Sequence, residues 1–169
     1  KAMPEAVAFL AASLEAAGMK VGSAALVAEE VLAACVLRQV VFFRGAFATT
    51  VARTCATALA AAHVRRVAMP LGLQDAAVIA QAAWPGASEQ GTIHAAVIEG
   101  INLGPIEVVY DTVADAVAAT KGRSLVFASM TSGLAALPDQ PLYLELGPIF
   151  DVDALDWKLI WGLNLGAGN

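Results

Sequence analysis

The sequence predicts an α/β fold, a mixed sheet with flanking helices, in a single domain that spans residues 1–169. Short β-branched and aromatic runs alternate with Ala-rich helical segments along the chain, which is typical of this class. The length is that of one domain and is enough to bury a core without disulfides or metal. The polar stretch 84–92, which contains Pro85 and Gly86, is the best candidate for an internal boundary.

Helices and strands are predicted from apolar spacing and from turn residues. Val7, Leu10 and Leu14 share one helical face, whereas the β-branched and aromatic run 40–43 is typical of a buried strand. The same criteria predict helices at residues 3–18, 24–37, 56–67 and 112–120, and strands at 40–43, 49–53, 76–80, 124–128 and 142–146. The residues around Val108 fit either a strand or a helix.

The composition bears on location and on self-association. Apolar residues make up 59% of the chain and many are alanine, so we expect tight packing and a homo-oligomer, most simply a dimer. No membrane span is expected, because charges interrupt the apolar runs; even the best window, 46–64, contains Arg53. No signal-peptide pattern is visible, and two cysteines without a CxxC pair fit a reduced, cytoplasmic setting.

The net charge of −5 is divided unevenly. Residues 1–84 contain seven basic and five acidic residues (+2), whereas residues 85–169 contain three basic and ten acidic residues (−7). The acidic half argues against a nucleic-acid partner, which requires dense Lys and Arg. The arginines of the first half fit either an acidic partner or solvated side chains: Arg38, Arg44, Arg53, Arg65 and Arg66.

Cys55 is the candidate nucleophile. It follows the expected strand 49–53 and precedes the expected helix 56–67, so it would lie at a helix N-terminus, where the dipole and unpaired N–H groups lower a thiol pKa. Arg53 would add to this effect. The placement predicts that Cys55 reacts faster than Cys35, which lies on an apolar helix face. The alternative is an inert core cysteine.

His94 is the candidate general base for Cys55, with a structural role as the alternative. His63, the other histidine, lies eight residues after Cys55, or about 12 Å along a helix, too far to exchange a proton with the thiol. No Cys/His spacing suits zinc, and no phosphate-loop or dinucleotide fingerprint is present. We therefore expect neither a metal nor a cofactor.

Several segments occur in the order found in one enzyme family. Phe43-Arg44-Gly45, followed by residues 50–59, resembles the nucleophile segment of β-ketoacyl synthases, condensing enzymes of the thiolase-like superfamily. The other segments that resemble motifs of this family are residues 71–75, 91–92, 104–107, 129–131 and the glycine-rich end 164–169.

The resemblance implies a shortened thiolase-like fold and an acyl-thioester-binding or acyl-transfer protein. Cys55 would take an acyl group from an acyl carrier protein or an acyl-CoA thioester, and Gly166 and Gly168 would bind substrate through backbone N–H groups. The family's two histidines would fall at Gln90 and near Ser132, so condensation is expected to be impaired. Two alternatives stay open: a non-catalytic α/β structural or assembly subunit, and an enzyme with an unrelated site.

Overall fold

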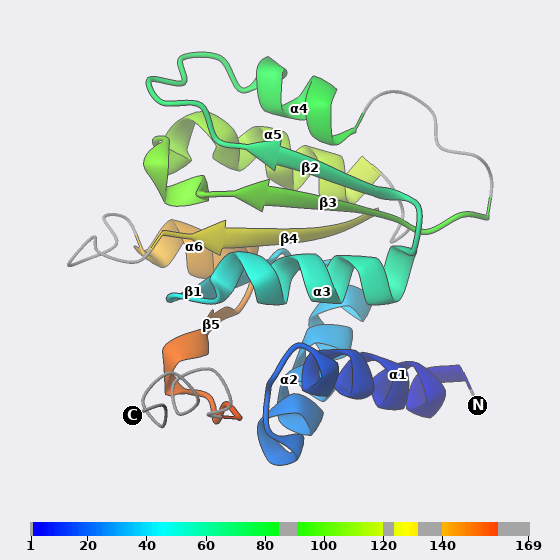
Figure 1. Ribbon diagram of the computed structural model, residues 1–169. Helices are drawn as coiled ribbons and strands as arrows, with labels where there is room; N and C mark the ends of the chain where they lie inside the picture. The colour runs from blue at the N-terminus through cyan, green and yellow to red at the C-terminus, as the bar shows by residue number, and fades with distance from the viewer. Residues whose placement is uncertain (1, 85–90, 120–123, 132–139, 159–169) are drawn as a thin grey trace, which may run out of the picture.

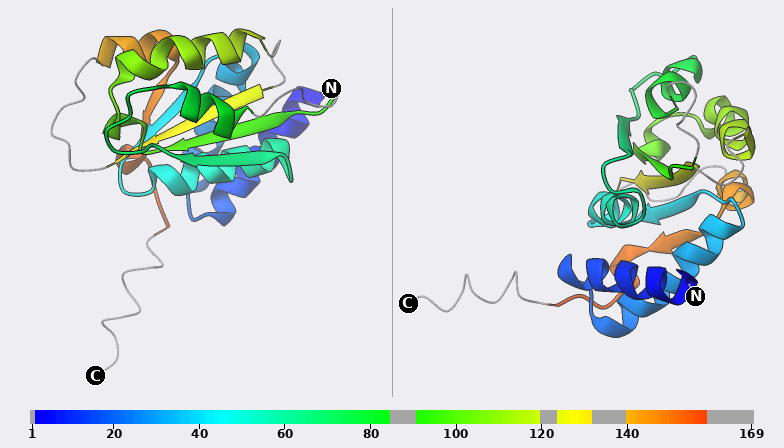
Figure 2. Two further views of the ribbon diagram at one scale, coloured as in Figure 1. Left: turned by 90° about the horizontal axis from the view of Figure 1, so that it is seen from above. Right: turned by 90° about the vertical axis from the view of Figure 1, so that its right-hand side faces the viewer.

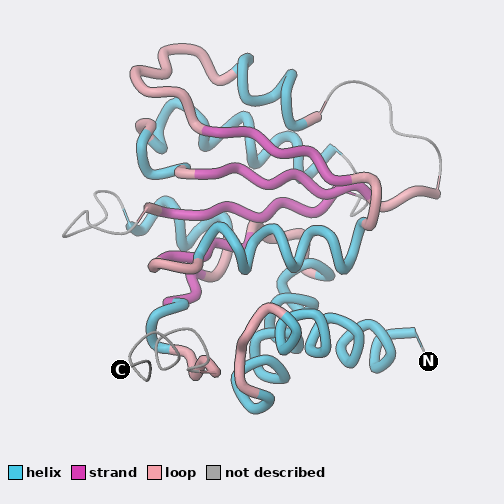
Figure 3. Tube along the Cα trace, in the orientation of Figure 1, coloured by secondary structure: helices cyan, strands magenta, loops and turns pink. Residues whose placement is uncertain are grey.

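A five-stranded sheet organises the chain. The computed structural model describes residues 2–84, 91–119, 124–131 and 140–158. Its strands are β1 (Val41–Arg44), β2 (Val64–Ala68), β3 (His94–Glu99), β4 (Ser124–Met130) and β5 (Ile149–Asp151). Their order is β2-β3-β4-β1-β5, and all four pairings are parallel (Figure 1; Figure 3). The predicted α/β class with flanking helices is confirmed, and the described sheet, which was expected to be mixed, is parallel in every pairing.

Helices cover both faces of this sheet (Figure 2). On one face lies α3 (Ala48–Ala60), with α1 (Ala2–Ala16) packed beside it, and α2 (Val21–Val36) packs against α1 and β1. The other face is covered by α4 (Ala77–Ala83), α5 (Ile106–Ala119) and α6 (Gln140–Leu146). Two short 3-10 helices, Ile101–Leu103 and Val152–Ala154, follow β3 and β5.

Side chains alternate along each strand between the two core layers. On β1, Phe43 belongs to the layer under α3, whereas Phe42 belongs to the layer under α5 and α6. Phe43 stacks on Phe150 with ring centroids 5.5 Å apart, and Phe42 meets Tyr143 edge-on at 5.4 Å. Burying an aromatic side chain completely stabilises the fold by about 1.5–3 kcal/mol. β1 therefore supports both layers.

The segment 49–53, predicted as a strand, is instead the first part of α3. Its β-branched residues Thr49, Thr50 and Val51 favour extended backbone when they are considered locally. In the structure, however, the buried positions Val51, Ala52 and Cys55 follow the spacing of one helical face. Packing of that face on the sheet outweighs the local preference, so the predicted strand is wrong.

The helix predicted over residues 56–67 is also wrong in its extent. α3 ends at Ala60, and Ala61, with a φ of 49°, turns the chain into the edge strand β2. Arg65 and Arg66, interpreted as the basic end of a helix, lie on this strand. An edge strand tolerates charged side chains because solvent reaches it from the open side.

Two more predicted strands are helices. Residues 76–80 fall largely within α4, and residues 142–146 form most of α6. A short apolar run alone does not distinguish a buried strand from a buried helix segment. The deciding contacts are tertiary: Ile79 and Tyr143 pack from these helices into the layer that covers the second face of the sheet.

The other predictions for helices and strands are confirmed. Helices predicted at 3–18, 24–37 and 112–120 correspond to α1, α2 and α5, which includes Val108, and strands predicted at 40–43 and 124–128 correspond to β1 and β4. Most of the stretch 84–92 lies outside the described residues, and the strands before and after it, β2 and β3, pair in the same sheet. Across the described ranges, no helix has the length and apolar character needed to cross a bilayer.

Candidate functional site

The carboxyl ends of the strands meet at one edge of the sheet because every pairing is parallel. The connections that follow the adjacent strands β1 and β4 run over opposite faces of the sheet. The chain passes from β1 through α3 to β2, and from β4 through α6 to β5. Open parallel sheets bind ligands outside the carboxyl ends of the strands at such a reversal. A ligand site is therefore expected at this edge.

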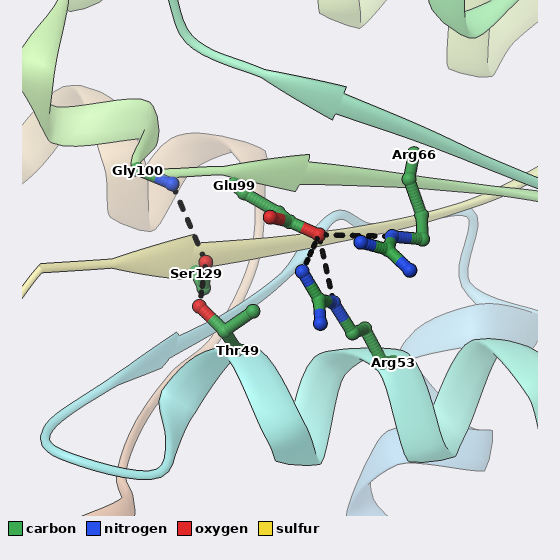
Figure 4. Close-up of polar contacts among 6 residues, drawn as sticks. All are labelled: Thr49, Arg53, Arg66, Glu99, Gly100 and Ser129. Carbon is green, nitrogen blue, oxygen red and sulfur yellow. Dashed lines mark hydrogen bonds and ion pairs between the residues drawn. The ribbon is translucent and has the colours of Figure 1, made fainter.

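Polar side chains gather here between α3 and the sheet (Figure 4). Ser129, Glu99 and Arg66 come from the neighbouring strands β4, β3 and β2, at positions that face α3. Thr49 and Arg53 lie four residues apart on α3, so both side chains are on the same side of that helix. We call Thr49, Arg53, Arg66, Glu99 and Ser129 the polar cluster.

One carboxylate oxygen of Glu99 binds two guanidinium groups. Arg53 donates to Oε1 through Nε at 2.8 Å and places Nη2 2.7 Å from the same atom, while Arg66 donates through Nε at 3.2 Å. The Glu99 side chain is 20% exposed, whereas Arg53 and Arg66 are 40% and 57% exposed. The triad thus has a net charge of +1, with its positive ends toward solvent.

Ser129 connects β4 to α3 and to the end of β3. Its hydroxyl is buried, accepts a hydrogen bond from Thr49 Oγ1 at 2.9 Å and accepts another from the Gly100 N–H at 3.3 Å. Gly100 follows Glu99 directly and has a φ of 67°, which favours glycine. The hydroxyl therefore fixes the end of β3, and with it the backbone from which Glu99 projects.

The loop from β1 into α3 is closed by a carboxylate of the same chain. The N–H of Ala46 donates to Asp153 Oδ1 at 3.0 Å. Gly45 has a φ of 119°, and a Cβ at that position would lie 2.7 Å from the Asp153 carboxylate. Beside it, Arg44 pairs with Asp151 at 3.3 Å. The start of α3 therefore faces an internal anion and Arg44 is balanced by Asp151, whereas the polar cluster keeps a net positive charge.

Cys55 does not lie at a helix N-terminus, so the placement on which its predicted reactivity rested is wrong. It lies within α3, beyond the first turn, where the helix dipole has little effect. Its side chain is fully buried in the core layer between α3 and the sheet. Burial raises the thiol pKa, Cys35 raises it further, and a backbone hydrogen bond lowers it only in part. Burial also raises the pKa of Cys35, to about 12.

His94 lies at the amino end of β3, at the opposite edge from the polar cluster. On this strand Ala95 and Val97 face α3, so the alternation directs His94 to the other face. Its ring meets that of His63, with centroids 5.1 Å apart. The structure therefore does not bring His94 to Cys55. Gly166 and Gly168, like Gln90 and Ser132, lie outside the described residues.

No protein-family model matches this chain, and no curated protein matches its sequence. The resemblance to β-ketoacyl synthases therefore stays a prediction from short segments.

The sequence pattern did not reveal the polar cluster as a unit. Arg53 and Arg66 were considered only as charges. Glu99 was not considered, and Ser129 was considered only as part of the segment 129–131. A signal was nevertheless present: each is a polar residue at or next to the end of an apolar run, in HAAVIE and SLVFASM. In a parallel sheet such positions lie at the edge where ligands bind.

Proposed function

We propose that this chain is a binding domain for a small anionic molecule that carries phosphate, held by Arg53 and Arg66 at the carboxyl edge of the sheet. The observation that carries the proposal is that one oxygen of Glu99 holds both guanidinium groups. Arginine suits phosphate because its planar group can donate two parallel hydrogen bonds. Glu99 restrains the two arginines before any ligand arrives, which lowers the entropic cost of binding.

The charge and the remaining donors support this class of ligand. The triad retains one net positive charge, and three guanidinium nitrogens form no hydrogen bond to a described residue: Nη1 of Arg53 and both terminal nitrogens of Arg66. A phosphate with two negative charges would complement these groups without displacing Glu99. Because the arginines are partly exposed, we expect modest affinity that weakens with salt.

The acyl-thioester prediction fits this proposal only in its binding part. Coenzyme A and the prosthetic group of an acyl carrier protein both carry phosphate, so they belong to the proposed ligand class. The buried Cys55 thiol and its raised pKa do not favour a covalent step. We therefore propose binding without acyl transfer through Cys55.

Calorimetric titration with pyrophosphate, coenzyme A and inorganic phosphate at constant ionic strength tests the proposal. We expect saturable binding that weakens about tenfold in Arg53→Gln and in Arg66→Gln. Each substitution removes a charge-assisted hydrogen bond to the ligand, and a loss of about tenfold is the usual cost of one such bond. Arg65→Gln is the matched control, because Arg65 is an exposed arginine of the same strand directed to the other face. No binding at millimolar concentration, or an equal loss in all three variants, would contradict the proposal.

A second candidate function is the predicted assembly subunit, and the surface of α1 and α2 favours it. Large exposed apolar side chains are concentrated on these helices and at their ends: Met3, Phe9, Val21, Leu26, Val36 and Leu37. Exposed apolar surface of this kind marks protein interfaces. Light scattering at micromolar concentration should give a homodimer that Phe9→Ser weakens, while Val78→Ser, an exposed apolar position on α4, leaves it unchanged.

A further inference from the structure

The two histidines of the chain, His63 and His94, lie in contact at the amino edge of the sheet. Their ring centroids are 5.1 Å apart and the rings are inclined at 66°. His63 lies between α3 and β2, and its carbonyl accepts a hydrogen bond from the Ala95 N–H at 3.0 Å. Since Val64 pairs with Ala95, the residues one step earlier stand side by side. The contact is thus built into the register of the sheet.

One ring nitrogen of this pair is unsatisfied. Nε2 of His94 is buried and has no hydrogen-bond partner among the described residues. A buried polar atom without a partner costs about 1–3 kcal/mol, and a ligand that reaches both this nitrogen and the neighbouring imidazole would remove that cost. His63 is exposed, which leaves its ring free to turn one nitrogen toward His94.

We propose that His63 and His94 together bind one divalent transition-metal ion, through one nitrogen of each ring. Neutral imidazole suits Ni²⁺, Cu²⁺ and Zn²⁺, whereas Mg²⁺ and Ca²⁺ prefer oxygen ligands. Among the described residues, no group of three or more His, Cys, Asp or Glu side chains could hold a metal. Water therefore completes the coordination, and the affinity is lower than that of a four-ligand structural site.

The ion would join the segment that leaves α3 to the first residue of β3. These two segments lead directly into Val64 and Ala95, the first pair of residues between the edge strand β2 and its neighbour β3. Binding to the folded chain alone stabilises it in proportion to the logarithm of the metal concentration above the dissociation constant. The site lies at the other end of β3 from the polar cluster, about 17 Å away along the strand at about 3.3 Å per residue. It does not depend on the proposed anion site.

Titration of the tag-free chain with Ni²⁺ at pH 7.5, followed by calorimetry and by thermal unfolding, tests the site. We expect one ion per chain and a rise in Tm. The chain has two histidines, so no other imidazole can account for such binding. His63→Ala, a change at an exposed position, should lower the affinity at least tenfold without loss of the fold. Cys35→Ala is the control and should bind Ni²⁺ like the unaltered chain.

One further measurement completes this test. Mg²⁺ at the same concentration should cause no rise in Tm, because Mg²⁺ prefers oxygen ligands. The proposal would be overturned by the absence of saturable Ni²⁺ binding up to about 1 mM, the order of dissociation constant expected for a weak site with two ligands. Undiminished binding in His63→Ala, or loss of binding in Cys35→Ala, would also overturn it.

Discussion

Arg53 and Cys55 lie two residues apart on α3, yet their surroundings differ. The Arg53 side chain is 40% exposed and bound to Glu99 at the carboxyl edge, whereas Cys55 is fully buried beneath the helix. Consecutive residues of a helix differ by about 100° in direction, so two steps separate these side chains by about 200°. The face of the helix, rather than proximity in the sequence, therefore decides which of the two side chains can contact a ligand.

Placing a charge at the buried position should have the largest effect. Cys55→Asp would put a carboxyl group without a designed partner into the core, which we expect to cost about 4 kcal/mol or more of unfolding free energy. Urea denaturation followed by circular dichroism measures this loss. Thr57→Asp, on an exposed position of the same helix, should cost less than about 1 kcal/mol. Equal losses in the two variants would refute the assignment of faces.

The raised thiol pKa values predict a loss of stability in alkaline solution. In the folded state burial raises the pKa of Cys35 from 9.0 to about 12, and that of Cys55 in the same direction. The thiols of the unfolded chain ionise at lower pH than those of the folded chain. Their ionisation therefore leaves the free energy of unfolding unchanged below about pH 9 and lowers it above that pH, by up to about 1.4 kcal/mol per pH unit for each thiol. Denaturation from pH 8 to 10.5 should show a shallower decrease in Cys35→Ala and Cys55→Ala than in the unaltered chain.

Alkylation of the native chain offers a direct test of the corrected placement. Cys35 is half-buried and Cys55 is fully buried, so iodoacetamide should label Cys35 at least tenfold faster at neutral pH, because thiolate and access both limit the rate. Peptide mapping by mass spectrometry gives the two rates. In concentrated urea the difference should vanish. Faster labelling of Cys55 in the native state would restore the nucleophile predicted from the sequence.

The smallest effect is expected at the partly exposed ion pairs that Arg53 and Arg66 form with Glu99. Glu99→Gln leaves two guanidinium groups without their shared carboxylate, and we expect a loss of about 1 kcal/mol, the scale of a partly exposed ion pair. The loss should shrink in 1 M salt, since screening weakens such pairs. Glu30→Gln, at an exposed position on α2, should be neutral within about 0.5 kcal/mol. A larger loss that salt does not change would indicate a packing role for Glu99.

Several elements could be predicted because their signal is local. The apolar runs of β1 and β4 and the periodic helices α1 and α5 were identified from spacing alone. The segment 49–53 failed because its β-branched residues and its helical face give opposite signals, and packing on the sheet decides between them. Arg65 and Arg66 misled for a related reason: basic residues suit both a helix end and an edge strand.

The candidate sites depended far more on tertiary structure. The sequence predicted Cys55 as the nucleophile because it was expected at a helix N-terminus. In the structure Cys55 is buried beneath α3, so that reason no longer applies. His94 was proposed as its partner, but the alternation along β3 turns the ring toward the other face, where it meets His63. A local pattern shows which residues of a strand share a face, but it does not show which element covers that face.

By itself the sequence determined the α/β class, the core strands β1 and β4, and the absence of a charge-free apolar run of about 20 residues, the length that a membrane span needs. Only the tertiary structure decided which polar residues act together. Arg53 and Glu99 are 46 residues apart, and Thr49 and Ser129 are 80 apart. They meet because parallel pairing in the order β2-β3-β4-β1 brings the carboxyl ends of the strands to one edge, beneath the first turns of α3. Strand order is set by the burial of both core layers, which involves the whole chain, so no short segment of the sequence predicts it.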